Sequence, residues 1–507
     1  MLGKLSTFAA AKVPADRFRQ PPATRRRFFR FEPTIALRVL RPPGSRAMMQ
    51  HLQYTDSFDH PFPILKDRPV RSALCTFSPR ICSLRSLVLV GMIVLPKAIA
   101  HAQYYFDEQP INYRRAAESN PVARLEEKLR AGEVHLRADE RGSHLASVLE
   151  LLDVPLSSQT LVFSKTSLQQ GRISPQTPRA VYFNDECYVA WVQDGLIEIG
   201  VMDDRLGAVF YSIRDGARNA TLNRDRGGCV ACHSTNRTQK VPGFLVRSVY
   251  TGADGHPRDF GTTSDHRSPF SGRWGGWYVT GTHGQMRHLG NELAIDPDDE
   301  EKIDAEKGAN LLSLTDRFVG KRYLTPHSDL VALMVMEHQS QMHNFITLAH
   351  YETVLALDAQ SKATDAPEAI ADQTRSRIEK AGDSLVEYML FCNEDQLTSP
   401  VAGTSTFVED FVTRGPVDSK GRSLRQFDLQ TRMFRYPCSY LIHSSAFDAL
   451  PQPVADYVRT RVLKVLKGED QSPTFSHLSA QTRREILEIL TETKPEWVQG
   501  SLSQSGG

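Results

Sequence analysis

Residues 229–233 read Cys-Val-Ala-Cys-His and so place two thiols and an imidazole within five positions. Cysteines three positions apart on a helical turn face the same way, so both thiols can form thioether bonds to the vinyl groups of one porphyrin. The histidine that follows then lies beneath the iron as its proximal ligand. The spacing predicts one covalent haem c, held by Cys229, Cys232 and His233.

Two other chemistries use cysteines at this spacing. A redox-active dithiol would occupy the junction of a strand and a helix, as in thioredoxin-like proteins. A zinc site would need a second pair of ligands at similar spacing, and the chain contains no second Cys-x-x-Cys. The histidine directly after the second cysteine favours haem over both alternatives.

A second axial ligand would saturate the iron, whereas an open face would bind small molecules such as peroxide, O₂ or NO. We expect His283 as the distal ligand, because it follows a Trp-rich strand on a Gly-rich loop, where glycines permit close approach to a flat cofactor. The alternatives are an open coordination position and the side chains of Met286, His288, Met334, Met336, His338, Met342, His343, His256 and His266. Arg267, Arg273 and Arg287 are either partners of the haem propionates or solvated loop arginines.

A leader is predicted over residues 1–102. A basic stretch at 78–86 precedes the apolar run LVLVGMIVLP and a small-x-small site at Ala100-His101-Ala102. This is the pattern of a secretory signal peptide, and its distance from Met1 indicates a start codon assigned too early. We therefore expect a periplasmic or otherwise extracytoplasmic protein that begins near Gln103 and keeps no stable membrane span.

The residues that follow predict an α+β fold. Helices are expected at 121–131 and 145–152. β-Branched and aromatic runs between 160 and 212 predict an antiparallel sheet that leads into the cysteine motif. Helical spacing then dominates at 329–357, 375–392, 453–467 and 480–493. We expect a haem-bearing domain over 103–305 and a helical domain over 306–507.

The distribution of charge constrains the binding partner. Residues 1–102 hold 17 Lys and Arg against 5 Asp and Glu, a net charge of +12, whereas the whole chain holds 61 against 59. The remainder therefore carries a net charge of −10. An acidic body argues against binding of nucleic acid. It would steer a basic redox partner protein toward the molecule.

Five segments carry a resemblance to known proteins. They are residues 173–185 (ISPQTPRAVYFND), 229–233 (CVACH), 273–284 (RWGGWYVTGTHG), 337–344 (EHQ and MHN) and 435–442 (RYPCSYLI). On these segments the chain from about Tyr113 to Pro495 resembles an uncharacterised periplasmic monohaem c-type cytochrome family of planctomycete-type bacteria. The resemblance implies a haem protein and no particular reaction.

Electron transfer is the expected function. Bacterial peroxidases built on c-type haem usually pair two haems, and only one attachment motif is present here. The alternatives are a peroxidase-like or other small-molecule oxidoreductase and a haem-based sensor or scaffold. About four hundred residues around one motif exceed what a simple carrier needs, so the sequence leaves open whether the protein is an enzyme.

Overall fold

The computed structural model describes residues 104–217, 220–294, 303–318, 320–363 and 369–500. The predicted leader and its cleavage site lie outside these residues. The described residues all belong to one compact unit, and the domain boundary expected near residue 305 falls within it.

A seven-stranded antiparallel sheet forms between residues 160 and 278, as the β-branched and aromatic runs predict. In spatial order its strands are β6 (Asn223–Arg224), β5 (Gly207–Arg214), β4 (Leu196–Asp203), β3 (Cys187–Trp191), β2 (Arg179–Phe183), β1 (Thr160–Val162) and β9 (Trp277–Tyr278). A separate two-stranded sheet pairs β7 (Val246–Ser248) with β8 (Thr262–Ser264). The sheet runs directly into the cysteine motif, which follows β6 by only a few residues.

The run at 180–192 forms a hairpin of two strands. Phe183 pairs with Tyr188 across the turn. The Asn184 side chain accepts hydrogen bonds from the backbone N–H groups of Glu186, at 3.0 Å, and Cys187, at 2.8 Å. Asn and Asp side chains stabilise turns in this way, so the polar residues reverse the chain within the run.

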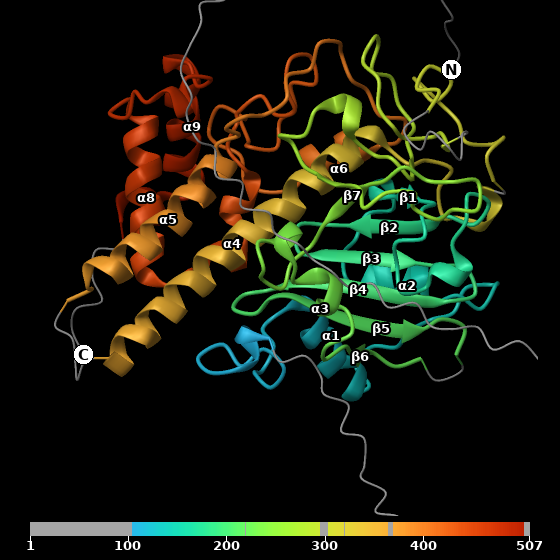
Figure 1. The fold of residues 1–507 in the computed structure, drawn as a ribbon, viewed down its shortest axis with the longest axis horizontal. Coiled ribbons are helices and arrows are strands. Elements are labelled where there is room, and N and C mark those ends of the chain that lie inside the picture. The colour runs from blue at the N-terminus through green and yellow to red at the C-terminus, as the bar shows by residue number, and fades with distance from the viewer. Residues whose placement is uncertain (1–103, 218–219, 295–302, 319, 364–368, 501–507) are drawn as a thin grey trace, which may run out of the picture. The chain divides into compact units, whose positions relative to one another are not determined.

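The α+β prediction is confirmed, because a mostly helical part follows the sheet. The helices are α1 (Pro121–Arg130), α2 (Leu145–Leu151), α3 (Val230–His233), α4 (Leu330–Ala363), α5 (Asp372–Met389), α6 (Phe407–Val412), α7 (Ser445–Asp448), α8 (Gln452–Leu466), α9 (Ala480–Thr493) and α10 (Pro495–Gln499). Helix α4 runs between the sheet and the C-terminal helices α5, α8 and α9 (Figure 1). None of the described helices has both the length and the apolar character of a membrane-spanning segment.

A buried carboxylate begins α4. One oxygen of Asp329 accepts from the backbone N–H groups of Val331 and Ala332, at 2.9 and 3.0 Å, which caps the helix. The other oxygen accepts from the backbone N–H groups of Thr404 and Ser405, at 2.8 and 2.9 Å. Asp329 therefore joins the start of α4 to a loop some seventy residues later in the chain.

Candidate haem site

The loop before the cysteine motif is organised by Asp225. Its carboxylate accepts backbone hydrogen bonds from Gly227, at 3.1 Å, Gly228, at 3.2 Å, and Cys229, at 2.8 Å. The next residues turn into the short helix α3, in which the backbone N–H groups of Cys232 and His233 both bond to the carbonyl of Cys229. This turn holds the two thiols and the imidazole on one small element.

Both thiols of the motif are free, with Cys229 half-buried and Cys232 exposed. Burial, followed by the nearby carboxylate of Asp225, raises the pKa of Cys229 to about 12. A redox-active dithiol has the opposite property, a nucleophilic cysteine with a lowered pKa. Cys187, Cys392 and Cys438 are also free and are buried.

The orientation of His233 is set by its backbone neighbour Gly243. Nδ1 of His233 lies 2.9 Å from the carbonyl oxygen of Gly243, and the N–H of Gly243 donates to the carbonyl of His233 at 2.8 Å. The Nδ1 contact fixes the tautomer with hydrogen on Nδ1, because a carbonyl can only accept. Nε2 forms no hydrogen bond with a described residue. Burial lowers the pKa of His233, which favours the neutral imidazole that a metal requires.

Helix α4 holds the segment that orients His233. The Asn344 side chain bonds to both backbone groups of Phe244, accepting from the N–H at 2.8 Å and donating to the C=O at 2.7 Å. A Cβ atom at Gly243 would lie only 2.2 Å from Oδ1 of Asn344, so a larger residue at 243 would collide with the Asn344 side chain. The proximal position therefore depends on contacts that join residues a hundred positions apart.

A cavity of about 450 Å³ adjoins the motif and is lined in part by Cys229, Cys232 and His233. Its floor is one face of the sheet, formed by cross-strand neighbours Trp277, Val162, Arg179, Val181, Ala190, Glu198, Tyr188, Gly200 and Phe210. Ala190 contributes a small side chain to this face, whereas the Phe244 ring lies over Gly200, where a Cβ atom would come within 2.9 Å of it. The volume lies within the roughly 300–1,000 Å³ of typical cofactor pockets.

Charged side chains also line the cavity. Arg179 and Glu198 form an ion pair at 2.7 Å. Lys165 and Arg247 line the cavity without an ion pair to any residue in the described ranges. Two free thiols, an oriented imidazole, a largely apolar floor and two cations without ion pairs fit the chemistry of a covalent haem, which carries two carboxylates.

The structure does not bring His283 to this cavity. Nδ1 of His283 lies 2.7 Å from the carbonyl oxygen of Met286, and Nε2 accepts from the N–H of Asn310 at 3.0 Å. Both ring nitrogens are thus engaged in a separate buried cluster with His288 and Phe270. Met286 and His288 lie outside the cavity lining as well.

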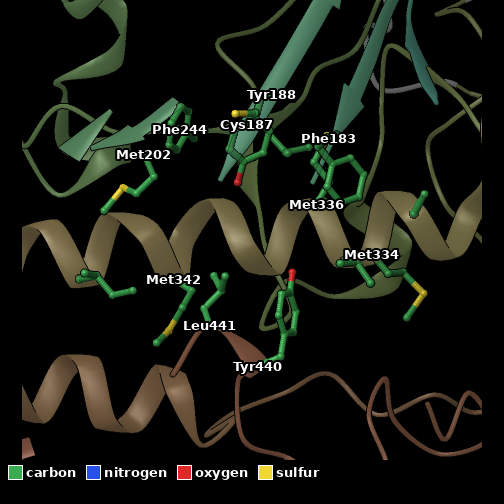
Figure 2. Packing of buried hydrophobic residues seen from close by; sticks show 14 of the residues in the cluster. Phe183, Cys187, Tyr188, Met202, Phe244, Met334, Met336, Met342, Tyr440 and Leu441 are labelled. Carbon is green, nitrogen blue, oxygen red and sulfur yellow. The ribbon is translucent and has the colours of Figure 1, made fainter. Parts of the chain in front are cut away.

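Of the distal candidates on α4, Met336 alone lines the cavity. Figure 2 shows Met336 on the side of α4 that faces the strands, near Phe183 and Tyr188, whereas Met342 lies on the opposite side near Leu441. The sulfur of Met336 accepts from the Thr160 hydroxyl of β1 at 3.8 Å. The His233 ring packs on Phe210 of β5, with centroids 4.7 Å apart. Strands β1 and β5 are four positions apart in the sheet, or about 19 Å, so Met336 and His233 contact well-separated strands.

The remaining histidines are used elsewhere. Nδ1 of His338 lies 2.8 Å from Nδ1 of His266, and its Nε2 lies 2.9 Å from the Ser439 hydroxyl. Nδ1 of His343 lies 3.1 Å from the Tyr188 hydroxyl. His256 is exposed, and none of these histidines lines the cavity.

The arginines expected near the propionates also lie elsewhere. Arg273 forms a buried ion pair with Glu337 at 2.6 Å, and Arg287 pairs with Glu306 at 2.6 Å. The guanidinium of Arg267 stacks 4.6 Å from the centroid of the Tyr388 ring. These side chains already have protein partners. Two of the three cations that line the cavity, Arg247 and Lys165, belong to no motif that sequence analysis could have found.

No protein-family model matches the sequence, and the searches of curated proteins and of solved structures found no match. Over the described ranges, no group of three or more His, Cys, Asp or Glu side chains is placed to hold a metal ion.

Proposed function

We propose that the chain is an extracytoplasmic monohaem c-type cytochrome of the resembled family and that it transfers electrons. Cys229 and Cys232 would hold the haem through thioether bonds, and His233 would supply an imidazole nitrogen to its iron. The observation that carries the proposal is His233, whose Nδ1–H is committed to the Gly243 carbonyl while Nε2 is left for iron beside two free thiols. Metal-bound histidines commonly donate their other N–H to a carbonyl in this way.

Different residues of this chain would attach the cofactor, orient its histidine ligand and line its cavity. Cys229 and Cys232 attach the cofactor, the Asn344–Gly243 contact orients the imidazole, and the apolar floor of the cavity excludes water. The bound haem would supply a one-electron redox couple. Cys232 is exposed, so the porphyrin edge attached there would lie at the surface, where a partner protein can reach it.

A second candidate, small-molecule binding by a sensor or an oxidoreductase, is favoured by the distal geometry. His283 lies outside the cavity, and Met336 contacts β1, whereas His233 packs on β5. An iron held by His233 alone would keep an open coordination position.

The optical spectrum of the haem-loaded protein separates the two candidates. Electron transfer predicts a six-coordinate, low-spin iron that does not bind CO when reduced. A five-coordinate, high-spin iron that binds CO readily would reject electron transfer in favour of ligand binding. Met336→Ala and its control Met342→Ala, on opposite sides of α4, then show whether the Met336 sulfur moves to the iron.

A further inference from the structure

The charges around the cavity are unbalanced. Three cationic side chains line it, Lys165, Arg179 and Arg247, against the single carboxylate of Glu198. Arg179 and Glu198 neutralise each other at 2.7 Å. Two positive charges, on Lys165 and Arg247, form no ion pair with any residue that the structure describes, although the Asp259 carboxylate lies near Arg247. A partly buried cation is costly unless it is paired, so this imbalance indicates an anionic ligand.

The Arg247 side chain has N–H groups for which no described residue supplies an acceptor. One terminal nitrogen donates to the carbonyl oxygen of Phe260 at 2.7 Å, and this is its only side-chain hydrogen bond to a described residue. Its Nε–H is buried and has no acceptor. Burial and the neighbouring Arg237 lower the pKa of Arg247, and the nearby carboxylate of Asp259, which forms no ion pair with Arg247, offsets them only in part. A carboxylate would satisfy the unused face of the planar guanidinium.

Lys165 is held at the cavity by its backbone, because its N–H donates to the carbonyl of Gly255 at 2.8 Å. Its ammonium group forms no hydrogen bond or ion pair with a residue in the described ranges. Lys165 and Arg247 thus offer two separate cations to one cavity.

We propose that Arg247 and Lys165 bind the two carboxylates of the cofactor and so fix how the porphyrin is turned about the axis through His233. The inference rests on the proposed function, because a haem carries two propionates. It assigns a positioning and tuning role to two residues that lie outside the attachment motif. Arg247 supplies a hydrogen-bonding fork, and Lys165 supplies a point charge.

The test compares Arg247→Gln and Lys165→Gln with Arg237→Gln in the haem-loaded protein. Arg237 is a matched control, because it also donates to the Phe260 carbonyl, at 2.8 Å, but does not line the cavity. The midpoint reduction potential is measured by spectroelectrochemical titration, and the propionate bending bands are measured by resonance Raman spectroscopy. Arg247→Gln and Lys165→Gln should lower the potential, since loss of a nearby positive charge favours the oxidised iron. Both should shift a propionate band, whereas Arg237→Gln should leave the bands unchanged.

Unchanged propionate bands in Arg247→Gln and Lys165→Gln, with covalent haem retained, would overturn the proposal. If Arg247→Gln fails to fold, Arg247→Lys keeps the charge and loses the fork, so it should shift the band with a smaller change in potential. A wild-type chain that acquires no covalent haem under c-type maturation would instead reject the proposed function, and this inference with it.

Discussion

The role of His233 depends on a contact made by a glycine far from the motif. The Gly243 carbonyl takes the Nδ1–H of His233, and Gly243 can lie there only because it has no side chain next to Asn344. Removing this contact would free the imidazole to rotate and would expose Nε2 to other partners. The residues outside the motif therefore control whether its histidine is ready to bind iron.

Gly243→Ala should destabilise the protein by about 1–3 kcal/mol, the usual cost of forcing extra atoms into a packed site. The reason is the 2.2 Å approach of the new Cβ to Oδ1 of Asn344. Gly272→Ala is the control, because a Cβ at that position meets no atom within 4 Å. Urea unfolding of both variants checks this prediction. Equal unfolding midpoints would show that the Asn344 side chain does not constrain position 243.

The buried histidines make stability depend on pH. Burial lowers the pKa of His343 from 6.5 to about 3. Between these values the unfolded chain binds a proton that the folded chain does not, so the free energy of unfolding falls as the pH falls. His343→Gln should reduce this slope by about 1.4 kcal/mol per pH unit between about pH 5.5 and 4.

The measurement is urea unfolding at several pH values, with exposed His256→Gln as the control. His256→Gln should keep the wild-type slope over this range. A His343→Gln protein with the wild-type slope would show that His343 titrates normally in the folded state.

Helix α4 contributes to several parts of the candidate site. It begins at Asp329, lines the cavity with Met336 and Ser340, and clamps the Gly243–Phe244 segment through Asn344. Nearly every residue of its first five turns is buried, because strands cover one side and helices cover the other. Displacement of this helix would disturb the proximal and distal sides of the site together.

Asp329→Ala should lower the free energy of unfolding by roughly 2–5 kcal/mol, because it removes the helix cap and leaves buried N–H groups without acceptors. Ser479→Ala removes the cap of the remote helix α9, where Ser479 accepts from the N–H of Thr482 at 3.1 Å. That variant should cost about 1 kcal/mol. Urea unfolding compares the two, and a smaller loss for Asp329→Ala than for Ser479→Ala would contradict the role assigned to Asp329.

Local signals predicted the elements well. The helix at 480–493 matches α9 exactly, and the Asp near the start of the 329–357 helix is its cap. Strand patterns between 160 and 212 predicted the sheet but not the turn at Asn184 that separates β2 from β3 within the run at 180–192. The Asn184 turn depends on side-chain hydrogen bonds within that run, which a count of β-branched residues does not detect.

The distal side could not be predicted in the same way. A helix whose first five turns are buried on all sides has no single amphipathic stripe, so spacing cannot say whether Met336 or Met342 faces the cavity. The prediction of His283 relied on its distance along the chain and on nearby glycines. Its engagement arises from contacts with Met286 and with Asn310, and no local pattern encodes the contact with a residue 27 positions later in the chain.

For the molecule as a whole, the local and the total charge differ in sign. Lys165 and Arg247 make the cavity locally positive, whereas the chain beyond residue 102 carries a net charge of −10. Two bound carboxylates would neutralise the local excess. The acidic body would then set the field that a partner protein meets.

A basic redox partner should therefore oxidise the reduced protein at a rate that falls as salt is added, because screening weakens the attraction. Stopped-flow measurement with a basic and an acidic cytochrome, at low and high ionic strength, checks this. Faster oxidation by the acidic cytochrome at low salt would show that the positive charges at the cavity, rather than the net negative charge of the chain beyond residue 102, direct docking.

The most direct test of the central claim is the intact mass of the denatured chain after co-expression with a c-type haem maturation system. We predict that the mass increases by one haem and that the modified peptide contains Cys229 and Cys232. The Cys229→Ala, Cys232→Ala double variant should show no increase. A wild-type chain of unmodified mass, or a double variant that keeps covalent haem, would contradict the account.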